Sequence, residues 1–381
     1  MSTTSAPSRE KISSGKRWTF RVLTVAFIGL LGTYAAESVL RWRQGNIDQS
    51  DVLAPGMVQY DPDLGWRLTP GWSGRHDHKE FSATYSINAL GFRNDAPLQV
   101  RIPGNRLTLV VGDSFTFGLG VNDDATFVHH LNATHPPGIS FSNGSIPGFS
   151  TDQQALLIGK HLLSLTPDRI LLVVYLGNDL FDNRRAFPLQ VSSPKPYFTV
   201  TEKGLELRNH PVPKQRKPPS SGPEGLVAAV WGEDIAQWPW RTRLEQQSEL
   251  FRIFSQQLLP ESDYRDVLRT RFKPETDLFN KIMDEIATAC QKRGVKLVIV
   301  TLAGRSFVTD PGSVSAQYQG LFREQVVSYA KVRQIEAIDV AGLMQSRFQQ
   351  QRKDWFYPND GHLNPAGHKV VAELLQARLS D

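Results

Sequence analysis

Short apolar segments alternate with longer amphipathic segments from about residue 107 to the end of the chain. The apolar segments have the length of β-strands and lie at 107–111, 139–142, 170–175, 295–301 and 335–340. The amphipathic segments have helical spacing and lie near 124–133, 151–165, 276–292, 313–332 and 365–379. This alternation predicts an α/β fold, with a parallel sheet covered by helices on both faces. Sites in such folds lie at the carboxyl ends of the strands.

The alternation is interrupted between about residues 184 and 273 by a proline-rich, irregular insertion. An insertion of this length is usually functional or disordered. Within it, residues 241–259 have helical spacing, with apolar positions roughly on one face at Leu244, Leu250, Phe251, Phe254 and Leu258. The simplest interpretation is a helix packed on its own domain. The alternative is a lid over the site or a face for a membrane partner.

Residues 45–104 form a different kind of segment, with proline, glycine and aromatic residues in short runs. Apolar and polar residues alternate at 81–87, which indicates short strands. We therefore interpret 45–104 as a small β-rich lead-in that packs on the main domain, which spans 105–381.

The N-terminal region contains a candidate membrane span. No charged residue occurs between Arg21 and Glu37, and the apolar segment 18–40 is long enough to cross a bilayer. The two charges lie near the ends, where side chains reach the interface, and Trp18 and Trp42 would lie at the two interfaces. The alternatives are a cleaved signal peptide and a buried helix of a soluble protein.

Positive residues crowd the N-terminal side of this segment at Arg9, Lys11 and Lys16. Positive charge flanking a span is retained in the cytoplasm. We therefore expect a cytoplasmic tail over 1–17, a signal-anchor helix over 18–40, and an exported remainder.

Composition narrows the class of protein. The chain has 381 residues, 40% hydrophobic and 21% charged, which excludes a wholly disordered protein. Its net charge is +5, and its Lys and Arg residues are scattered along the chain, so the charge pattern does not indicate a nucleic-acid-binding surface. Cys290 is the single cysteine, which rules out an intramolecular disulfide and suggests a small buried apolar residue.

A serine stands directly after the first predicted strand of the sheet, in the segment LTLVVGDSFTFGLGV. Ser114 would lie at the strand's carboxyl end, and the next residues can begin a helix whose free N–H groups face an oxyanion. The position suits a nucleophile, but it also suits a helix cap, because Asp113 and Ser114 are both good N-cap residues. Gly118 and Gly120 lack the further residues of a phosphate-binding or dinucleotide-binding loop.

A nucleophilic serine needs a base and an orienting acid. Both stand in the segment YPNDGHLNPAGH, in a loop before the last predicted helix. Residues two apart in an extended loop point to the same side, so Asp360 could accept from His362 Nδ1 and leave Nε2 for Ser114. A metal site using Asp360, His362 and His368 is the alternative, which no acidic cluster supports.

Acyl transfer also needs hydrogen-bond donors for the oxyanion. Gly148 follows the second predicted strand, where a backbone N–H can approach a ligand without a Cβ in the way. Asn178 follows the third, and its side-chain amide is a neutral donor. Turn formation explains the Gly-Asn-Asp segment equally well.

The chain resembles the SGNH/GDSL hydrolase superfamily in four blocks, which follow one another in the same order. The blocks are Gly112-Asp113-Ser114-Phe115, Gly148, Gly177-Asn178-Asp179 and Asp360-Gly361-His362. The resemblance covers about residues 105–380. The lead-in, with DPDLGWRLTPGW and INALGFRN, is similar to the segment that precedes the first block in many membrane-tethered bacterial members.

The resemblance implies a three-layer α/β/α, flavodoxin-like fold and ester chemistry without a metal or cofactor. It assigns the nucleophile to Ser114, whose N–H also serves the oxyanion hole. Gly148 and Asn178 match the other two oxyanion donors, through the backbone N–H and the side-chain amide respectively. His362 matches the base and Asp360 the acid.

The last block departs from the commonest family pattern, which has two residues between the acid and the histidine. Here Gly361 alone intervenes, and Leu363 follows where proline is usual. This spacing resembles the alginate O-acetyltransferase-like branch, whose members acylate polysaccharides outside the cytoplasm.

Three functions remain open. The first is a serine-dependent acyl esterase in a bacterial inner membrane, with its catalytic domain in the periplasm or outside the cell. The second is an O-acetyltransferase that modifies an envelope or extracellular polysaccharide and receives its acyl group from a membrane partner. The third is a non-catalytic carbohydrate-binding protein whose insertion offers Trp231, Trp238 and Trp240. The substrate in the first two is an acylated carbohydrate or another ester.

Overall fold

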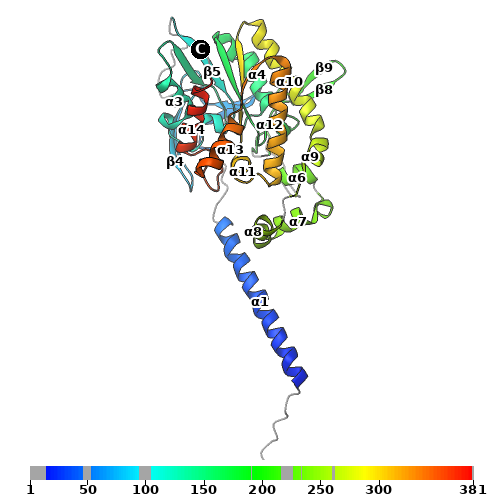
Figure 1. Cartoon of the computed structure of the whole chain (residues 1–381). Helices are drawn as coiled ribbons and strands as arrows, with labels where there is room; N and C mark the ends of the chain where they lie inside the picture. Colours follow the sequence, from blue (N-terminus) through cyan, green and yellow to red (C-terminus); the bar gives the residue numbers. More distant parts are fainter. Residues whose placement is uncertain are drawn as a thin grey trace, which may run out of the picture. The chain divides into compact units, whose positions relative to one another are not determined.

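The computed structural model describes residues 14–45, 53–93, 104–189, 191–215, 226–232, 234–259 and 262–379. The chain divides into two compact units (Figure 1). The helical unit comprises Met1–Asp48 and Trp238–Pro260, and the sheet unit comprises Gln49–Gln237 and Glu261–Asp381. Parts of the predicted tail, lead-in and insertion lie outside the described residues, namely 1–13, 46–52, 94–103 and 216–225.

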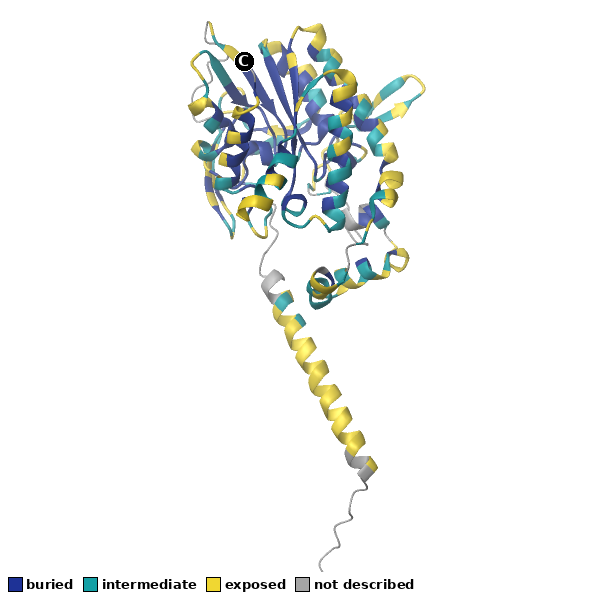
Figure 2. Cartoon of the chain, viewed as in Figure 1, coloured by how far each residue is buried: buried dark blue, intermediate teal, exposed yellow. Residues whose placement is uncertain are grey.

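The sheet unit is built on five parallel strands in the order β11-β10-β7-β5-β6. Their bounds are β5 Arg106–Val111, β6 Ile139–Asn143, β7 Arg169–Tyr175, β10 Lys296–Leu302 and β11 Glu336–Ile338. All seven residues of β7, the central strand, are buried, and the sheet is dark blue in Figure 2. The strand order reverses between β5 and β7, as in flavodoxin-like sheets, which confirms the predicted fold class.

Helices pack on the sheet in two groups, one on each side (Figure 1). In the first group, α3 (Phe127–Thr134) packs against α14 (Pro365–Gln376). In the second, α10 (Lys273–Lys292) packs against α4 (Thr151–Lys160) and α12 (Val314–Arg333). The predicted helical segments are therefore present, with ends that differ by a few residues.

Local capping explains where several helices begin. Ser313 Oγ accepts from Ala316 N at the start of α12, and Asn364 Oδ1 accepts from Gly367 N at the start of α14. The sequence prediction lacks α13 (Val340–Gln351), which directly follows β11. Its cap is Asp339, whose carboxylate accepts from Gly342 N at 3.2 Å and also pairs with Arg323.

The lead-in consists of two antiparallel hairpins. The first pairs β1 (Val58–Asp61) with β2 (Gly65–Leu68), and the second pairs β3 (Ser73–Asp77) with β4 (Ser82–Ser86), the strand predicted at 81–87. Tyr85 on β4 is fully buried and joins the same core as the sheet. The hairpins therefore belong to the sheet unit, and their burial places them where they can act on the site.

The insertion contributes to both units. In the sheet unit it forms the hairpin of β8 (Tyr197–Thr201) and β9 (Gly204–Arg208), and the helices α6 (Leu226–Trp231) and α9 (Arg265–Arg271). The composition of the insertion predicts irregular structure, but these segments form strands and helices. The part of the insertion in the helical unit differs most from the prediction.

The prediction of one helix at 241–259 is wrong, because the structure has two helices, α7 (Trp240–Gln247) and α8 (Glu249–Leu258). Ser248 separates them with an extended backbone, and its Oγ accepts from Phe251 N at 3.1 Å. A serine that caps the second helix cannot continue the first. The two helices cluster with the N-terminal helix in the helical unit.

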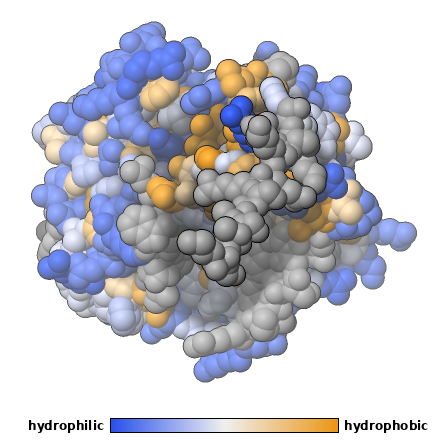
Figure 3. Space-filling model, turned by 90° about the horizontal axis from the view of Figure 1, so that it is seen from below, coloured by the Kyte–Doolittle hydropathy of each residue, from blue (hydrophilic) through white to orange (hydrophobic). Residues whose placement is uncertain are grey.

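The N-terminal helix α1 runs over Ser14–Gly45. Its segment Trp18–Arg41 is long and apolar enough to cross a membrane, with a mean hydropathy of 1.6 over its most apolar window and no burial there. Figure 2 shows most of α1 as exposed. Seen from below, the surface in Figure 3 has orange hydrophobic patches among the blue hydrophilic residues. The side chain of Trp42, expected at an interface, lies outside the described part of the chain.

Candidate active site

Ser114 lies where the sequence predicts, at the carboxyl end of β5. It is the first residue of the short helix α2 (Ser114–Phe117), and its predecessor Asp113 is the N-cap. The Asp113 carboxylate accepts from Phe115 N at 3.0 Å. Because Asp113 does the capping, the Ser114 hydroxyl is left for another partner.

That partner is His362, which comes from the loop before α14. The structure places His362 Nε2 2.8 Å from Ser114 Oγ, and His362 Nδ1 2.8 Å from Asp360 Oδ1. A carboxylate only accepts hydrogen bonds, so Nδ1 carries the ring proton and Nε2 is the acceptor for the serine hydroxyl. The three side chains therefore have the geometry of the serine, base and acid relay that the sequence spacing predicts.

Asp360 has a pKa below its ordinary value. Burial alone would raise the pKa of this carboxyl, but the hydrogen bonds and the charge of His362 outweigh burial and lower it. Asp360 is therefore ionised at neutral pH and can stabilise a histidine that takes up a proton.

The short spacing between acid and histidine depends on Gly361. Its φ is +83°, a conformation that residues with a Cβ rarely adopt. The turn is closed by Gly361 N donating to Tyr357 O at 3.0 Å and by Tyr357 N donating to His362 O at 2.8 Å. One glycine in a tight turn thus brings Asp360 and His362 to the same side.

Gly148 lies in the loop after β6, next to the strand that carries Ser114. Its φ is +79°, and a Cβ there would stand 2.6 Å from the side chain of Val191. The neighbouring Pro147 O accepts from Trp66 Nε1 at 2.9 Å, which fixes the loop to the lead-in. Within the described ranges, no hydrogen bond uses the backbone N–H of Ser114 or Gly148, so both remain available to a ligand.

Asn178 follows β7, the strand on the other side of β5, and is 5% exposed. Its Nδ2 donates to Asp182 Oδ2 at 2.9 Å. A side-chain amide has two N–H groups, so one remains for a ligand after this bond. Burial raises the pKa of Asp182, although Lys195 and Asn178 act against that shift.

Comparison of the sequence with models of known protein families identifies the family. Residues 110–370 match the model of the GDSL-like Lipase/Acylhydrolase family, a match that includes every site residue above. The chain belongs to this family. It is therefore an SGNH-type hydrolase that acts on ester bonds.

Solved structures similar to this GDSL family member are distant. One is a lipolytic protein of the G-D-S-L family from Veillonella parvula, with 13% identity over 72% of this chain and 100% of that chain, and a TM-score of 0.38. Another is an acetylxylan esterase from Geobacillus stearothermophilus, with 11% identity over 72% of this chain and 94% of that chain, and a TM-score of 0.41. No curated protein sequence matches the chain.

Sequence reasoning does not find Glu80 of the lead-in, which holds the loop that carries Asp360 and His362 in this GDSL family member. The Glu80 carboxylate accepts from Asn359 N at 3.0 Å, from Asn359 Nδ2 at 2.9 Å and from Asp360 N at 2.6 Å. The bonds join residues 279 and 280 positions apart, so no local pattern signals them. Glu80 thereby orients the backbone that carries Asp360, the predicted acid.

Replacing Glu80 with alanine is expected to lower kcat/KM for p-nitrophenyl acetate by about tenfold to a hundredfold, because a small displacement of a catalytic group is costly. Glu80→Gln keeps an acceptor oxygen and is expected to lose less. Glu202→Ala removes an exposed carboxylate from the β8–β9 turn and serves as the matched control. Steady-state kinetics check this, and equal activity of Glu80→Ala and the control would contradict it.

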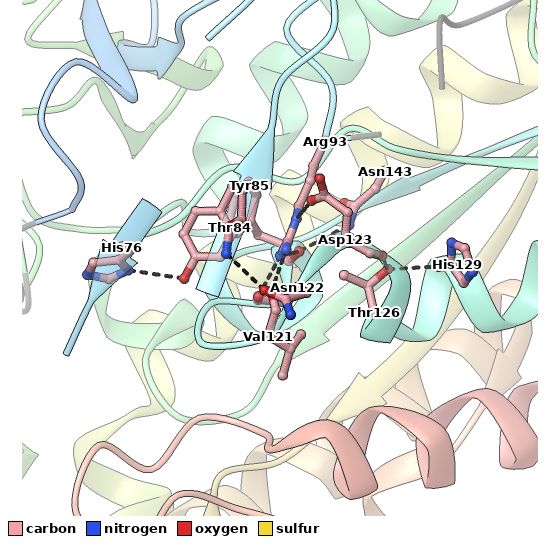
Figure 4. A network of polar contacts seen from close by, with 12 residues as sticks. His76, Thr84, Tyr85, Arg93, Val121, Asn122, Asp123, Thr126, His129 and Asn143 are labelled. Carbon is pink, nitrogen blue, oxygen red and sulfur yellow. Dashed lines mark hydrogen bonds and ion pairs between the residues drawn. The ribbon is translucent and has the colours of Figure 1, made fainter. Parts of the chain in front are cut away.

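Arg93 holds the loop that follows α2 (Figure 4). Its buried guanidinium pairs with Asp123 at 2.8 Å and donates to the backbone oxygens of Phe117, Gly118 and Val121. Tyr85 Oη accepts from Gly120 N at 2.9 Å in the same loop. Arg93 and Tyr85 belong to the lead-in, so this segment contacts the loop after Ser114, the predicted nucleophile, as well as the loop that carries Asp360.

A second buried cluster joins segments that follow the predicted oxyanion donors along the chain. Lys195 and Asp152 form an ion pair in which both side chains are fully buried. The backbone N–H of Asp152 donates to Asn183 Oδ1, in the segment after β7, at 3.0 Å. Through this pair and the bond to Asn183, the insertion is joined to α4 and to the segment after β7, which follow Gly148 and Asn178 along the chain.

His368 does not join Asp360 and His362. Its Nδ1 accepts from Phe127 N at 3.3 Å and its ring stacks on that of Phe127. Among the described residues, no three His, Cys, Asp or Glu side chains form a group that could hold a metal ion. The metal site considered as an alternative is therefore not assembled, and Cys290 is buried as expected.

His368 predicts a pH dependence of stability. Burial lowers the pKa of its imidazole from 6.5 to about 3, so between these values the unfolded chain binds more protons than the folded chain. The contribution of His368 to the free energy of unfolding is therefore fully present above pH 6.5 and is lost as the pH falls. Between pH 7 and pH 5 the free energy of unfolding should decrease by about 2 kcal/mol. Urea unfolding at both values should show this loss in the wild type and a smaller loss in His368→Gln; equal losses would contradict it.

Proposed function

We propose that the chain is a membrane-anchored serine esterase that acts outside the cytoplasm through an acyl-enzyme on Ser114. The observation that carries this proposal is the pair of 2.8 Å contacts from His362, one to Ser114 Oγ and one to Asp360 Oδ1. A histidine that is oriented by a carboxylate and accepts from a serine hydroxyl makes that hydroxyl a nucleophile at neutral pH.

In the first half-reaction, Ser114 Oγ attacks the acyl carbonyl while His362 Nε2 takes the hydroxyl proton. The negative charge on the carbonyl oxygen is accepted by the N–H groups of Ser114 and Gly148 and by Asn178 Nδ2. His362 then gives the proton to the departing alcohol, and the acyl group remains on Ser114. Asp360 stabilises the protonated histidine during both transfers.

In the second half-reaction, water takes the place of the alcohol. His362 Nε2 removes a proton from the water, which attacks the acyl carbonyl through the same oxyanion site. The carboxylic acid leaves, and the proton on His362 returns to Ser114 Oγ. Every proton in this cycle is carried by His362, so no metal or cofactor is required.

The proposed location rests on α1. We propose that Trp18–Arg41 spans a bacterial inner membrane, with the Arg- and Lys-rich N-terminus in the cytoplasm and the sheet unit in the periplasm or outside the cell. An exported domain meets envelope and extracellular polymers, which supports an acylated carbohydrate as the ester substrate.

The Asp-Gly-His spacing supports a second candidate. A sugar hydroxyl in place of water would make the protein an O-acetyltransferase, with its acyl group supplied by a membrane partner. The third candidate, a non-catalytic carbohydrate-binding surface, loses support. Trp240 is 59% exposed, but Trp238 is 6% exposed and Trp231 packs edge-on against Tyr264.

The test supplies p-nitrophenyl acetate and an unacetylated oligosaccharide to the full chain in detergent. Release of acetate supports the esterase, whereas acetylated sugar supports the transferase. Because both reactions pass through Ser114, the Ser114→Ala variant should form neither product. If neither product forms with folded wild-type protein, the proposed function is wrong.

A further inference from the structure

The helical unit contains a contact between α1 and α8 that the esterase function does not use. The Glu37 carboxylate of α1 accepts from Glu249 N, Leu250 N and Ser248 Oγ, each at 3.0 Å. Two of these donors are the first two N–H groups of α8, which have no partner within their own helix. The third is the hydroxyl of Ser248, the N-cap of α8. Arg41, one turn further along α1, pairs with Glu37 at 2.7 Å.

This contact fixes where α8 starts. Glu37 and Arg41 lie in the last turns of the apolar segment Trp18–Arg41. This is the C-terminal end of the segment, from which the chain continues into the domain that we propose is exported. A carboxylate at this depth is costly unless it is paired. Capping α8 supplies that pairing, and it ties α8 to the level at which α1 would leave the bilayer.

The hairpin of α7 and α8 has internal polar contacts that keep the helices together. Arg241 pairs with Glu245 at 2.9 Å, and its guanidinium also donates to Ser255 O at 3.2 Å on the other helix. Ser255 is fully buried and its hydroxyl donates to Glu245. The polar groups thus face inward between the helices, which leaves the outer surface to other side chains.

Large apolar side chains make up that outer surface. Trp240 and Leu244 on α7 are 59% and 37% exposed, and Phe254 and Leu258 on α8 are 47% and 69% exposed. Each pair is spaced four residues apart, so it shares one side of its helix. The half-buried ring of Phe251 contacts both Trp240 and Phe254, which joins the two pairs into one apolar surface.

We propose that the α7–α8 hairpin is an interfacial element that lies on the lipid bilayer around the exit of α1. Its occupant is the lipid surface itself, into which the apolar surface of Trp240, Leu244, Phe254 and Leu258 inserts at the headgroup boundary. This proposal rests on α1 spanning the membrane.

Continuity with α1 is the reason to choose lipid over a protein partner. The contacts of Glu37 hold the apolar surface beside a helix that is already in lipid, so the hairpin reaches the bilayer without a separate docking step. The segment Trp240–Leu258 carries three Arg and two Glu, a net charge of +1. A short amphipathic helix pair with aromatic side chains and slight positive charge suits an interface plane.

The test uses the full chain in liposomes of phosphatidylethanolamine and phosphatidylglycerol, with Cys290→Ala to remove the native thiol. A fluorescent nitrobenzoxadiazole group is attached in turn to Leu258→Cys on the apolar surface, Gln246→Cys on the opposite side of α7, and Leu30→Cys in α1. Quenching by doxyl-labelled lipid reports contact with the bilayer. Quenching by aqueous iodide reports exposure to water.

We expect doxyl lipid to quench the probes at Leu258 and Leu30 and to leave the probe at Gln246 bright. Glu37→Ala should abolish quenching at Leu258 and keep it at Leu30, because only the tether is lost. Quenching at Leu30 with an iodide-sensitive Leu258 would overturn the interfacial hairpin and leave the anchor intact. A Leu258 probe shielded from both quenchers would indicate a protein partner and overturn it too. Without quenching at Leu30, both the anchor and the hairpin proposal fail.

Discussion

Replacing Ser114 with alanine is expected to lower kcat/KM for p-nitrophenyl acetate by roughly 10⁴-fold or more, because the acyl-enzyme can no longer form. Ser114 is the residue whose Oγ lies 2.8 Å from His362 Nε2. His362→Ala is expected to cost a similar factor, since the two side chains act as one unit. The double variant should therefore be no slower than either single variant.

Steady-state kinetics on the full chain in detergent check these three variants together. Ser346→Ala removes an exposed hydroxyl from α13 and provides the control for a serine lost elsewhere. Wild-type melting behaviour of Ser114→Ala would show that the loss is chemical. Activity of Ser114→Ala within tenfold of the wild type would remove Ser114 from the mechanism.

Replacing Asn178 with alanine is expected to lower kcat by about 10²–10³-fold with little change in KM, because in the proposed mechanism its amide binds the oxyanion of the transition state and not the ground-state ester. The N–H groups of Ser114 and Gly148 would remain, so some catalysis should survive. The split between kcat and KM separates this role from a structural one, in which both parameters and the melting temperature would change together.

Asp182→Asn is the informative companion variant, because Asp182 accepts from Asn178 Nδ2 at 2.9 Å. An asparagine there keeps the shape but can turn a donor toward the amide, which misplaces Asn178. We expect its kcat to fall less than that of Asn178→Ala. A wild-type kcat in Asn178→Ala would mean that backbone N–H groups alone hold the oxyanion.

The sheet and the relay could be predicted because their signals are local. Each strand is a short apolar run, Ser114 directly follows one of them, and Asp360 and His362 are two residues apart. Parallel strands then bring these loops to one edge of the sheet. Only the structure shows that Asp113 is the residue that caps α2, because Asp113 and Ser114 are equally good caps by residue type.

The supports of the site could not be predicted, because they join segments far apart in the chain. Glu80 acts on Asn359 and Asp360, and Arg93 acts on the loop after α2, from a lead-in whose sequence signals only short strands. The break at Ser248 has a signal, a serine before Glu249, but the apolar spacing continues through it. Spacing alone therefore favours one helix where capping makes two.

Covalent labelling of the full chain with a fluorophosphonate, followed by peptide mass spectrometry, tests the central claim most directly. We expect one adduct, on the peptide that contains Ser114, and no adduct in Ser114→Ala. The same labelling should slow strongly in His362→Ala, because the base is missing. An adduct on a different residue, or none on folded protein that still hydrolyses p-nitrophenyl acetate, would contradict Ser114 as the nucleophile.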